Sequence, residues 1–172
     1  MNGKIADTEM TEAQRRNAAR GSMAWHPEVT DFLTLRIGIV AKLIDRHASH
    51  MLASRFRMTL AEWRVLSQLA ITSNATVRAL AEGMSVDRAE VSRAATSLIR
   101  RGCVRRSDNP ADRRSPLFAC TEEGLKLFRA VRPVRRKFQA ALATELTPDQ
   151  LAGLGEALDR LTLFLQEDKR FK

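Results

Sequence analysis

Apolar side chains recur at three- and four-residue steps along much of the chain, which is the pattern of amphipathic helices. We expect a long helix to begin at Pro27 and to end near residues 53–56. A second helix begins at Thr59, where Glu62 completes a capping box of the form T-L-A-E. A third, shorter helix is predicted at about Val77–Gly83.

A fourth helix begins after Asp87, which is a favoured N-cap residue, and ends at Arg100-Arg101-Gly102 with two cations and a glycine. Together with the short helix before it, this segment has the form of a helix-turn-helix over about residues 76–101. Ser85 occupies the turn, where glycine is usual, so we expect a left-handed backbone and a modest strain at that residue.

The period of the pattern changes in the segment 103–120. CVRRS (103–107) and PLFAC (116–120) are predicted to form strands around a turn-rich loop. If the two strands pair symmetrically, Cys103 and Cys120 face each other. Three helices followed by a hairpin form a winged helix-turn-helix core, with residues 103–120 as the wing.

Long helices flank this core on both sides. Thr121 caps one that runs to about Ala143 and is expected to kink at Pro133, and Thr147-Pro148 starts the last one. Residues 1–24 are polar and are expected to form a flexible arm, while residues 25–168 form the domain. The predicted fold is thus mostly α-helical, with a small β-hairpin wing.

The net charge of the chain indicates a class of function for this fold. The chain has a net charge of +9 and a pI near 10.7, which is typical of proteins that bind nucleic acid, although anionic lipid or an acidic partner would also suit a basic surface. The stretch from Arg88 to Arg114 holds eight arginines against three acidic residues, a net charge of +5. Arginine forks onto phosphate and fits narrow minor grooves.

The first exposed turns of the fourth helix would therefore read bases in the major groove, and the loop of the hairpin would grip the backbone beside them. The Asp112 carboxylate is expected to brace a wing arginine so that the guanidinium points outward, since an unpaired carboxylate would repel phosphate. Arg88 and Arg93 could instead be solvated side chains paired to Glu90 or Asp87. The candidate DNA-binding residues are Thr76, Arg78, Arg88, Ala89, Glu90, Ser92, Arg93, Arg113 and Arg114.

The run LAEGMSVDRAEVSRAATSLIRRGCVRRSDNPADRRSPLFACTEEG (80–124) resembles the DNA-binding core of the MarR family of bacterial transcriptional regulators. Asp112-Arg113-Arg114 matches the D-x-R of that family's wing. Thr121-Glu122-Glu123-Gly124 matches its strand end, a threonine followed by two residues and a glycine. The resemblance covers about residues 27–166.

The resemblance implies a homodimer held together by helices at 27–53 and 122–168, with two wings that straddle the duplex. By position, Arg114 would enter the minor groove, while Arg88, Ser92 and Arg93 would lie in the major groove. A two-fold dimer reads two half-sites, so the operator would be a pseudo-palindrome. The usual role is repression, which a small aromatic or phenolic acid relieves.

Candidate effector residues lie mostly on the first long helix. His47 and His50 are three residues apart and would bind an effector carboxylate together with Arg36, Arg46 or Arg64. Trp25 and Trp63 would wall an aromatic pocket, although either could equally belong to the core, and the histidines could be ordinary surface residues. No carboxylate or cysteine completes a ligand set nearby, so we expect no metal.

Other function classes find little support in the sequence. It has no glycine-rich phosphate loop and no nucleophile elbow, so we expect neither an enzyme nor a cofactor. No apolar run is long enough to span a membrane, and residues 1–23 are polar and lack the apolar stretch of a signal peptide, so a bacterial cytoplasmic location on the nucleoid is expected. The alternatives are a non-specific architectural DNA-binding protein and a regulator that responds to oxidation of its cysteines.

Overall fold

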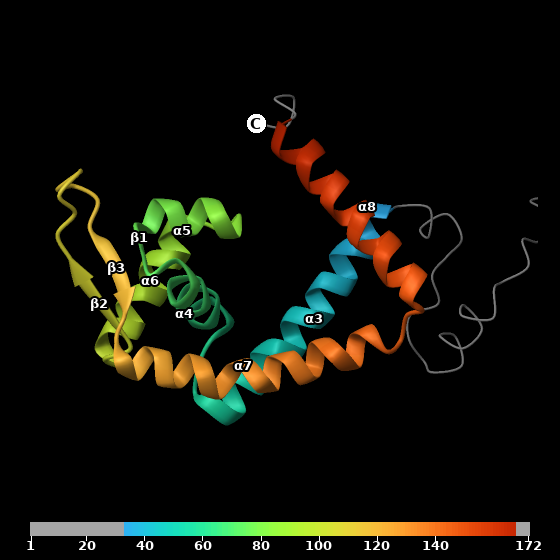
Figure 1. The fold of residues 1–172 in the computed structure, drawn as a ribbon, viewed down its shortest axis with the longest axis horizontal. Coiled ribbons are helices and arrows are strands. Elements are labelled where there is room, and N and C mark those ends of the chain that lie inside the picture. Colours follow the sequence, from blue (N-terminus) through green and yellow to red (C-terminus); the bar gives the residue numbers. More distant parts are fainter. Residues whose placement is uncertain (1–32, 168–172) are drawn as a thin grey trace, which may run out of the picture. The chain divides into compact units, whose positions relative to one another are not determined.

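The computed structural model describes residues 33–167 of the 172-residue chain. The predicted arm at 1–24, Trp25 and the predicted helix start at Pro27 lie outside the described residues. Within them, six helices and three short strands follow one another (Figure 1). In chain order these are α3 (Leu33–Phe56), α4 (Leu60–Thr72), β1 (Asn74–Ala75), α5 (Val77–Met84), α6 (Arg88–Arg100), β2 (Val104–Ser107), β3 (Leu117–Cys120), α7 (Glu122–Ala143) and α8 (Pro148–Glu167).

Side chains at the starts of the helices satisfy backbone N–H groups that have no partner inside the helix. The capping box of α4 is confirmed, because Thr59 N–H donates to Glu62 Oε2 at 2.7 Å and Glu62 N–H donates to Thr59 Oγ1 at 3.1 Å. Asp87 and Thr121 cap α6 and α7 as predicted. α7 then continues through Pro133 to Ala143.

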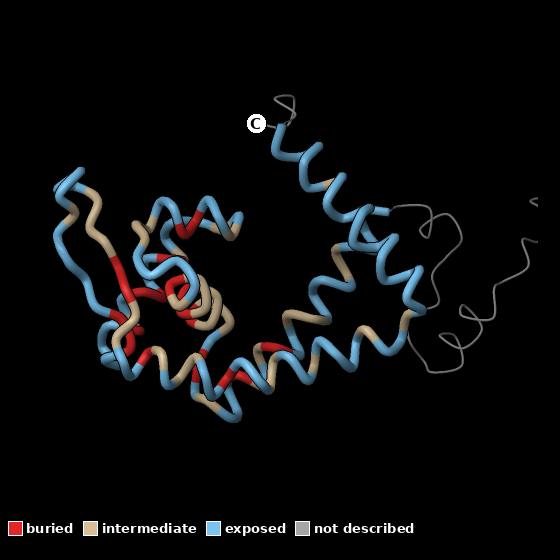
Figure 2. The backbone as a smooth tube through the Cα atoms, viewed as in Figure 1, coloured by how far each residue is buried: buried red, intermediate tan, exposed pale blue. Residues whose placement is uncertain are grey.

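The hydrophobic core belongs to the part of the chain that begins at Ala48, which is described here apart from the segment that ends at His47. α4 lies at its centre and packs against α5, α6, α7 and the sheet. The buried residues appear as short red stretches of the tube in Figure 2, surrounded by exposed backbone. The largest fully buried side chains are Leu52, Met58, Val65, Leu66, Leu69, Leu80, Val91, Leu98 and Val131.

The wing is part of a three-stranded antiparallel sheet with the order β1-β3-β2. The hairpin of β2 and β3 was predicted, but β1 was not, since two residues carry no alternation that a pattern could reveal. The expected pairing of the two cysteines is wrong. Cys120 lies opposite Val104, and Cys103 precedes the strand, where its carbonyl accepts from Thr121 N–H at 3.0 Å.

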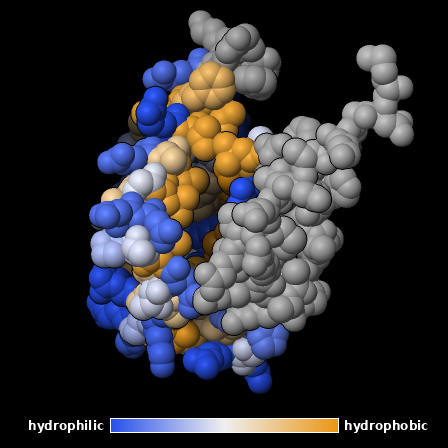
Figure 3. Space-filling model, turned by 90° about the vertical axis from the view of Figure 1, so that its right-hand side faces the viewer, coloured by the Kyte–Doolittle hydropathy of each residue, from blue (hydrophilic) through white to orange (hydrophobic). Residues whose placement is uncertain are grey.

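The two long flanking helices expose many apolar side chains. None of the residues in α8 is buried. Figure 3 shows hydrophobic side chains gathered on the side of the molecule that it draws. In the described part of the chain, no helix is apolar over enough length to cross a membrane. The exposed apolar residues of α3 are Leu33, Leu35, Ile37, Val40 and Leu43, and those of α8 are Leu151, Leu154, Leu158, Leu163, Phe164 and Leu165.

Candidate nucleic-acid interface

The turn between α5 and α6 has the backbone that the sequence predicts. Ser85 ends α5 in the left-handed conformation, with φ 51° and ψ 45°. The N–H of Ser85 donates to the carbonyl of Glu82, and the N–H of Val86 donates to that of Ala81 at 3.1 Å. These bonds offset the modest cost of a left-handed serine and fix the direction in which α6 leaves the turn.

α6 presents two faces of different character. Val91, Ala94, Ala95 and Leu98 are buried against the core. The opposite face carries the predicted base-reading residues: Arg88, Ala89, Ser92 and Arg93 are exposed, and Glu90 is partly buried. The helix is therefore anchored along one side and free along the other, as an element that enters a groove must be.

A carboxylate on α5 organises two of the candidate arginines. Arg78 Nε donates to Glu82 Oε1 at 2.8 Å, and Arg88 Nη2 lies 3.7 Å from the same oxygen. The side-chain hydrogen bond to Glu82 raises the pKa of Arg78. The partner that the structure gives Arg88 is thus Glu82, and not the Glu90 or Asp87 considered from the sequence. All three side chains are more than half exposed, so the pairs contribute little to stability.

The tip of the wing is a compact turn built on two acceptor side chains. Asp112 Oδ1 accepts from Arg114 N–H at 3.0 Å, and Asn109 Oδ1 accepts from Ala111 N–H at 3.1 Å. The Asn109 amide also donates to the carbonyl of Ser115 at 2.9 Å. Asp112 therefore holds the backbone at Arg114 and not an arginine guanidinium, which is the group it was expected to brace. The side chains of Arg113 and Arg114 are exposed.

The base of the wing is fixed by the predicted motif of threonine, two residues and glycine. Thr121 Oγ1 donates to the carbonyl of Gly102 at 2.6 Å and accepts from Gly124 N–H at 3.1 Å. Gly124 is buried, and a Cβ at this position would lie 2.0 Å from the carbonyl oxygen of Cys103. The first turn of α7 thus packs directly on the backbone that joins α6 to β2, which explains why glycine is needed.

Both cysteines lie in the packed interior of this region. Cys103 is buried and belongs to the core cluster, against which the half-buried Cys120 packs. Burial raises the pKa of the Cys103 thiol. Burial, followed by the neighbouring Cys103, raises the pKa of Cys120 to about 11. Because the thiolate is the reactive form, both groups are poor nucleophiles at neutral pH.

The candidate effector residues fall in different surroundings. Arg36, His47 and His50 are exposed on α3. Trp63 is partly buried, and its ring stacks on Phe128 with the centroids 5.7 Å apart.

A separate open pocket of about 500 Å³ lies between α4 and the turn of the helix-turn-helix. It is lined by Arg64, Ser67, Gln68, Met84, Ser85 and Val86. Of the effector candidates considered from the sequence that the structure describes, only Arg64 lines this pocket.

The contacts of two residues in this region were not predicted from the sequence. Glu82 is the first, although the i, i+4 spacing of Arg78 and Glu82 is a signal that could have been used. The other is Arg101, whose guanidinium reaches carbonyls more than 40 residues away in the sequence. No local pattern marks such a contact.

Comparison with known proteins gives consistent matches. A model of the MarR family matches residues 58–115. An uncharacterized protein of Mycobacterium tuberculosis is 28% identical over 124 residues, which are 72% of this chain and 86% of that protein.

Solved structures match over more of the chain. A mutant MarR from E. coli in complex with operator DNA is 27% identical, covers 75% of this chain and 92% of its own, and has a TM-score of 0.68. A MarR family transcriptional regulator from Silicibacter pomeroyi is 26% identical with a TM-score of 0.72, over 83% of this chain and 95% of its own.

Proposed function

The chain belongs to the MarR family of DNA-binding transcriptional regulators, and on that premise we propose that it is a homodimer that binds a pseudo-palindromic operator and represses transcription. One observation carries the proposal: apart from Arg101, whose guanidinium is held by backbone carbonyls, the arginines from Arg88 to Arg114 are exposed on α6 and the wing. Such a surface gains free energy by displacing counterions from phosphates.

α6 would read base edges from the major groove. Arg88 and Arg93 can each fork onto guanine O6 and N7, and Ser92 can reach a base or a phosphate. Ala89 suits a thymine methyl group, and Glu90 can accept from cytosine N4. The exposure of Arg88, Ala89, Ser92 and Arg93 beside a buried helix face supports this placement. Thr76 and Arg78, at the start of α5, would contact the backbone.

The wing would grip the neighbouring minor groove. The turn held by Asp112 presents Arg113 and Arg114 on successive residues, and arginine is favoured in narrow minor grooves. The E. coli MarR structure to which this chain is similar holds operator DNA. We expect these two side chains to supply affinity on most sequences and little base preference.

The dimer would form through the outer helices. α8 exposes six large apolar side chains and α3 exposes five, which is more apolar surface than a monomer in water normally leaves uncovered. A second copy of the chain would cover both faces. Replacing Leu158 with Glu is expected to shift the protein from dimer to monomer in sedimentation equilibrium, and an unchanged mass would argue against α8 as the interface.

The effector would be a small aromatic or phenolic acid. The open pocket beside the helix-turn-helix turn offers Arg64, Ser67 and Gln68 as polar groups for a carboxylate and Met84 and Val86 as apolar walls. Arg36, His47 and His50 on α3, with Trp25 and Trp63, form the other candidate set.

Thermal shift with a panel of aromatic acids detects an effector, because a ligand at 100 times its Kd stabilises by about 2.7 kcal/mol, and two variants then separate the candidate sets. Arg64→Gln abolishes the shift if the pocket is the site, and Arg36→Gln abolishes it if α3 is. A panel of aromatic acids without any shift would exclude this effector class.

DNase I footprinting of the full-length protein on the region upstream of its own gene tests the function as a whole. We expect discrete, two-fold symmetric protection of two half-sites about one helical turn apart. Diffuse coverage that follows protein concentration would identify an architectural binder, and no protection at low salt would refute DNA binding by this surface.

A further inference from the structure

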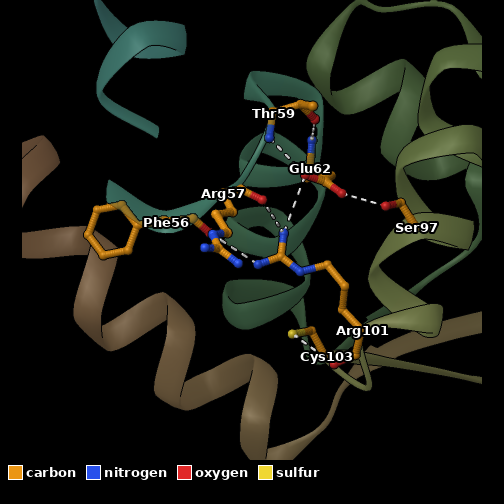
Figure 4. Close-up of polar contacts among 7 residues, drawn as sticks. All are labelled: Phe56, Arg57, Thr59, Glu62, Ser97, Arg101 and Cys103. Atoms are coloured by element: carbon orange, nitrogen blue, oxygen red, sulfur yellow. Dashed lines mark hydrogen bonds and ion pairs between the residues drawn. The ribbon is translucent and has the colours of Figure 1, made fainter. Parts of the chain in front are cut away.

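The C-terminal end of α6 is tied to the end of another helix by a single guanidinium. Arg101 Nη2 donates to the carbonyl of Phe56 at 3.2 Å, and its Nη1 donates to the carbonyl of Arg57 at 3.1 Å (Figure 4). These carbonyls lie at and just after the last residue of α3, where the helix leaves its acceptors without internal partners. Arg101, at the C-terminal end of α6, therefore satisfies two carbonyls at the end of α3.

A buried carboxylate completes this junction. Glu62 keeps 5% of its accessible surface, and its Oε2 lies 3.5 Å from Arg101 Nη1. Its Oε1 accepts from Ser97 Oγ on α6 at 2.6 Å, while its capping bonds hold the start of α4. One carboxylate thus binds groups from α4 and α6 at once, in a setting where an unpaired charge would be costly.

The geometry needs an arginine. The planar fork reaches three acceptors on two nitrogens, whereas a lysine ammonium is a point charge on a flexible stem. Both Arg101 and its neighbour Arg100 are exposed residues, but the Arg101 guanidinium bonds to two carbonyls and lies beside Glu62. Arg100 ends the same helix and has no such contact among the described residues. The two adjacent arginines therefore have different surroundings despite equal charge.

The junction lies at the opposite end of α6 from Arg88, so a change in angle at the junction moves the N-terminal end of the helix. The 13 residues of α6 span about 20 Å at 1.5 Å per residue, so a tilt of roughly 10° at Arg101 displaces the N-terminal end by about 3.5 Å. That displacement is close to the rise of one base pair, about 3.4 Å. A small loss of order at this end would misplace Arg88 and its neighbours in the groove.

We infer that Arg101 is a positioning residue for DNA recognition: held by Glu62 and the end of α3, it fixes the recognition helix so that the two helices of a dimer keep the spacing of their half-sites. This inference rests on the proposed function. Arg101 contributes through geometry and not through contact with phosphate.

Three full-length variants test this role. Arg101→Gln removes the fork and the charge, Arg101→Lys removes the fork alone, and Arg100→Gln is the control that removes the same charge one residue away. Each is titrated by fluorescence anisotropy against the footprinted operator and against the same duplex with one base pair inserted between the half-sites, over a series of salt concentrations.

Arg101→Gln and Arg101→Lys are expected to weaken operator binding about tenfold, the cost of roughly one mismatched base pair. The slope of log K against log salt should stay that of the wild type. Both variants should also discriminate less against the inserted base pair, because their recognition helices are less strictly placed. Arg100→Gln should keep the full penalty for the insertion, and its slope should fall by about 0.9 if Arg100 contacts a phosphate.

The inference is overturned if the inserted base pair weakens binding by Arg101→Gln as much as binding by the wild type. A slope of log K against log salt that falls by about 0.9 would also overturn it, because such a fall marks a direct phosphate contact. If Arg101→Gln does not fold, Ser97→Ala replaces it, because it removes one α6 donor from Glu62 and is expected to relax the spacing in the same direction. An unchanged penalty in Ser97→Ala would then overturn the inference. A wild type that fails to bind the operator refutes the proposed function instead.

Discussion

Replacing Gly124 with alanine tests how the wing is joined to the rest of the domain. An added Cβ would lie 2.0 Å from the oxygen and 3.0 Å from the carbon of the Cys103 carbonyl, and 3.3 Å from a methyl group of Leu66. The obstacle is backbone, which cannot rotate away as the end of a side chain can. Either α7 or the junction between α6 and β2 has to move.

Three contributions set the size of the effect. Overpacking costs about 1–3 kcal/mol. Displacing the Cys103 carbonyl also strains its hydrogen bond from Thr121 N–H, which is worth about 1 kcal/mol. Alanine returns about 1 kcal/mol as a better helix former than glycine. The net loss is about 1–3 kcal/mol, and a chain of this size loses roughly 2–4 °C in Tm for each kcal/mol.

Thermal unfolding followed by circular dichroism, at one fixed protein concentration, measures this loss. Gly83→Ala is the matched control, since it adds the same Cβ within α5 and meets only Gln68 Nε2 at 3.9 Å. We expect Gly124→Ala to lower the Tm by about 2–12 °C, and Gly83→Ala to leave it unchanged or raise it slightly. A Tm of Gly124→Ala equal to that of the control would refute the close packing of α7 on Cys103.

Three further predictions concern the cap, the wing and the thiols. Thr76→Ala removes the N-cap of α5 and should cost about 1 kcal/mol in urea unfolding, whereas Thr96→Ala should not, because that hydroxyl bonds only within its own helix. Asp112→Ala should weaken DNA binding in a gel-shift titration by loosening the turn at Arg114, and Asp108→Ala, which removes an equal charge from the wing, should strengthen it; equal effects would exclude the bracing role. Because the pKa of Cys120 rises from 9.0 to about 11 on folding, the unfolded chain releases this proton first. The stability should therefore fall as the pH rises from 9 to 11, and Cys120→Val should show a shallower fall; identical profiles would contradict the burial of this thiol.

The helix starts could be predicted because their chemistry is local. The capping box at Thr59, the N-cap at Asp87 and the Thr147-Pro148 start each lie within four residues of the backbone groups they satisfy. The left-handed turn at Ser85 followed from its place between two amphipathic segments. The exposed arginine face of α6 followed from the same periodicity.

What the sequence could not give depends on tertiary register and on distant partners. The cysteines were expected to face each other, but the strands pair one residue out of that symmetry, with Cys120 opposite Val104. β1 is too short to carry a pattern. Glu62 was predicted as a capping residue, while its bonds to α6 join residues 35 and 39 positions apart in the chain, which no local spacing encodes.

A competition titration tests the central claim most directly. The full-length protein, bound to a labelled duplex from the region upstream of its own gene, is displaced by that duplex unlabelled or by a shuffled duplex of equal length, at two salt concentrations. The exposed arginine surface of α6 and the wing predicts that the specific duplex binds at least about 10³-fold more tightly, and that affinity for both duplexes falls steeply with salt. Equal affinity for the two duplexes, or binding that salt does not weaken, would contradict the account.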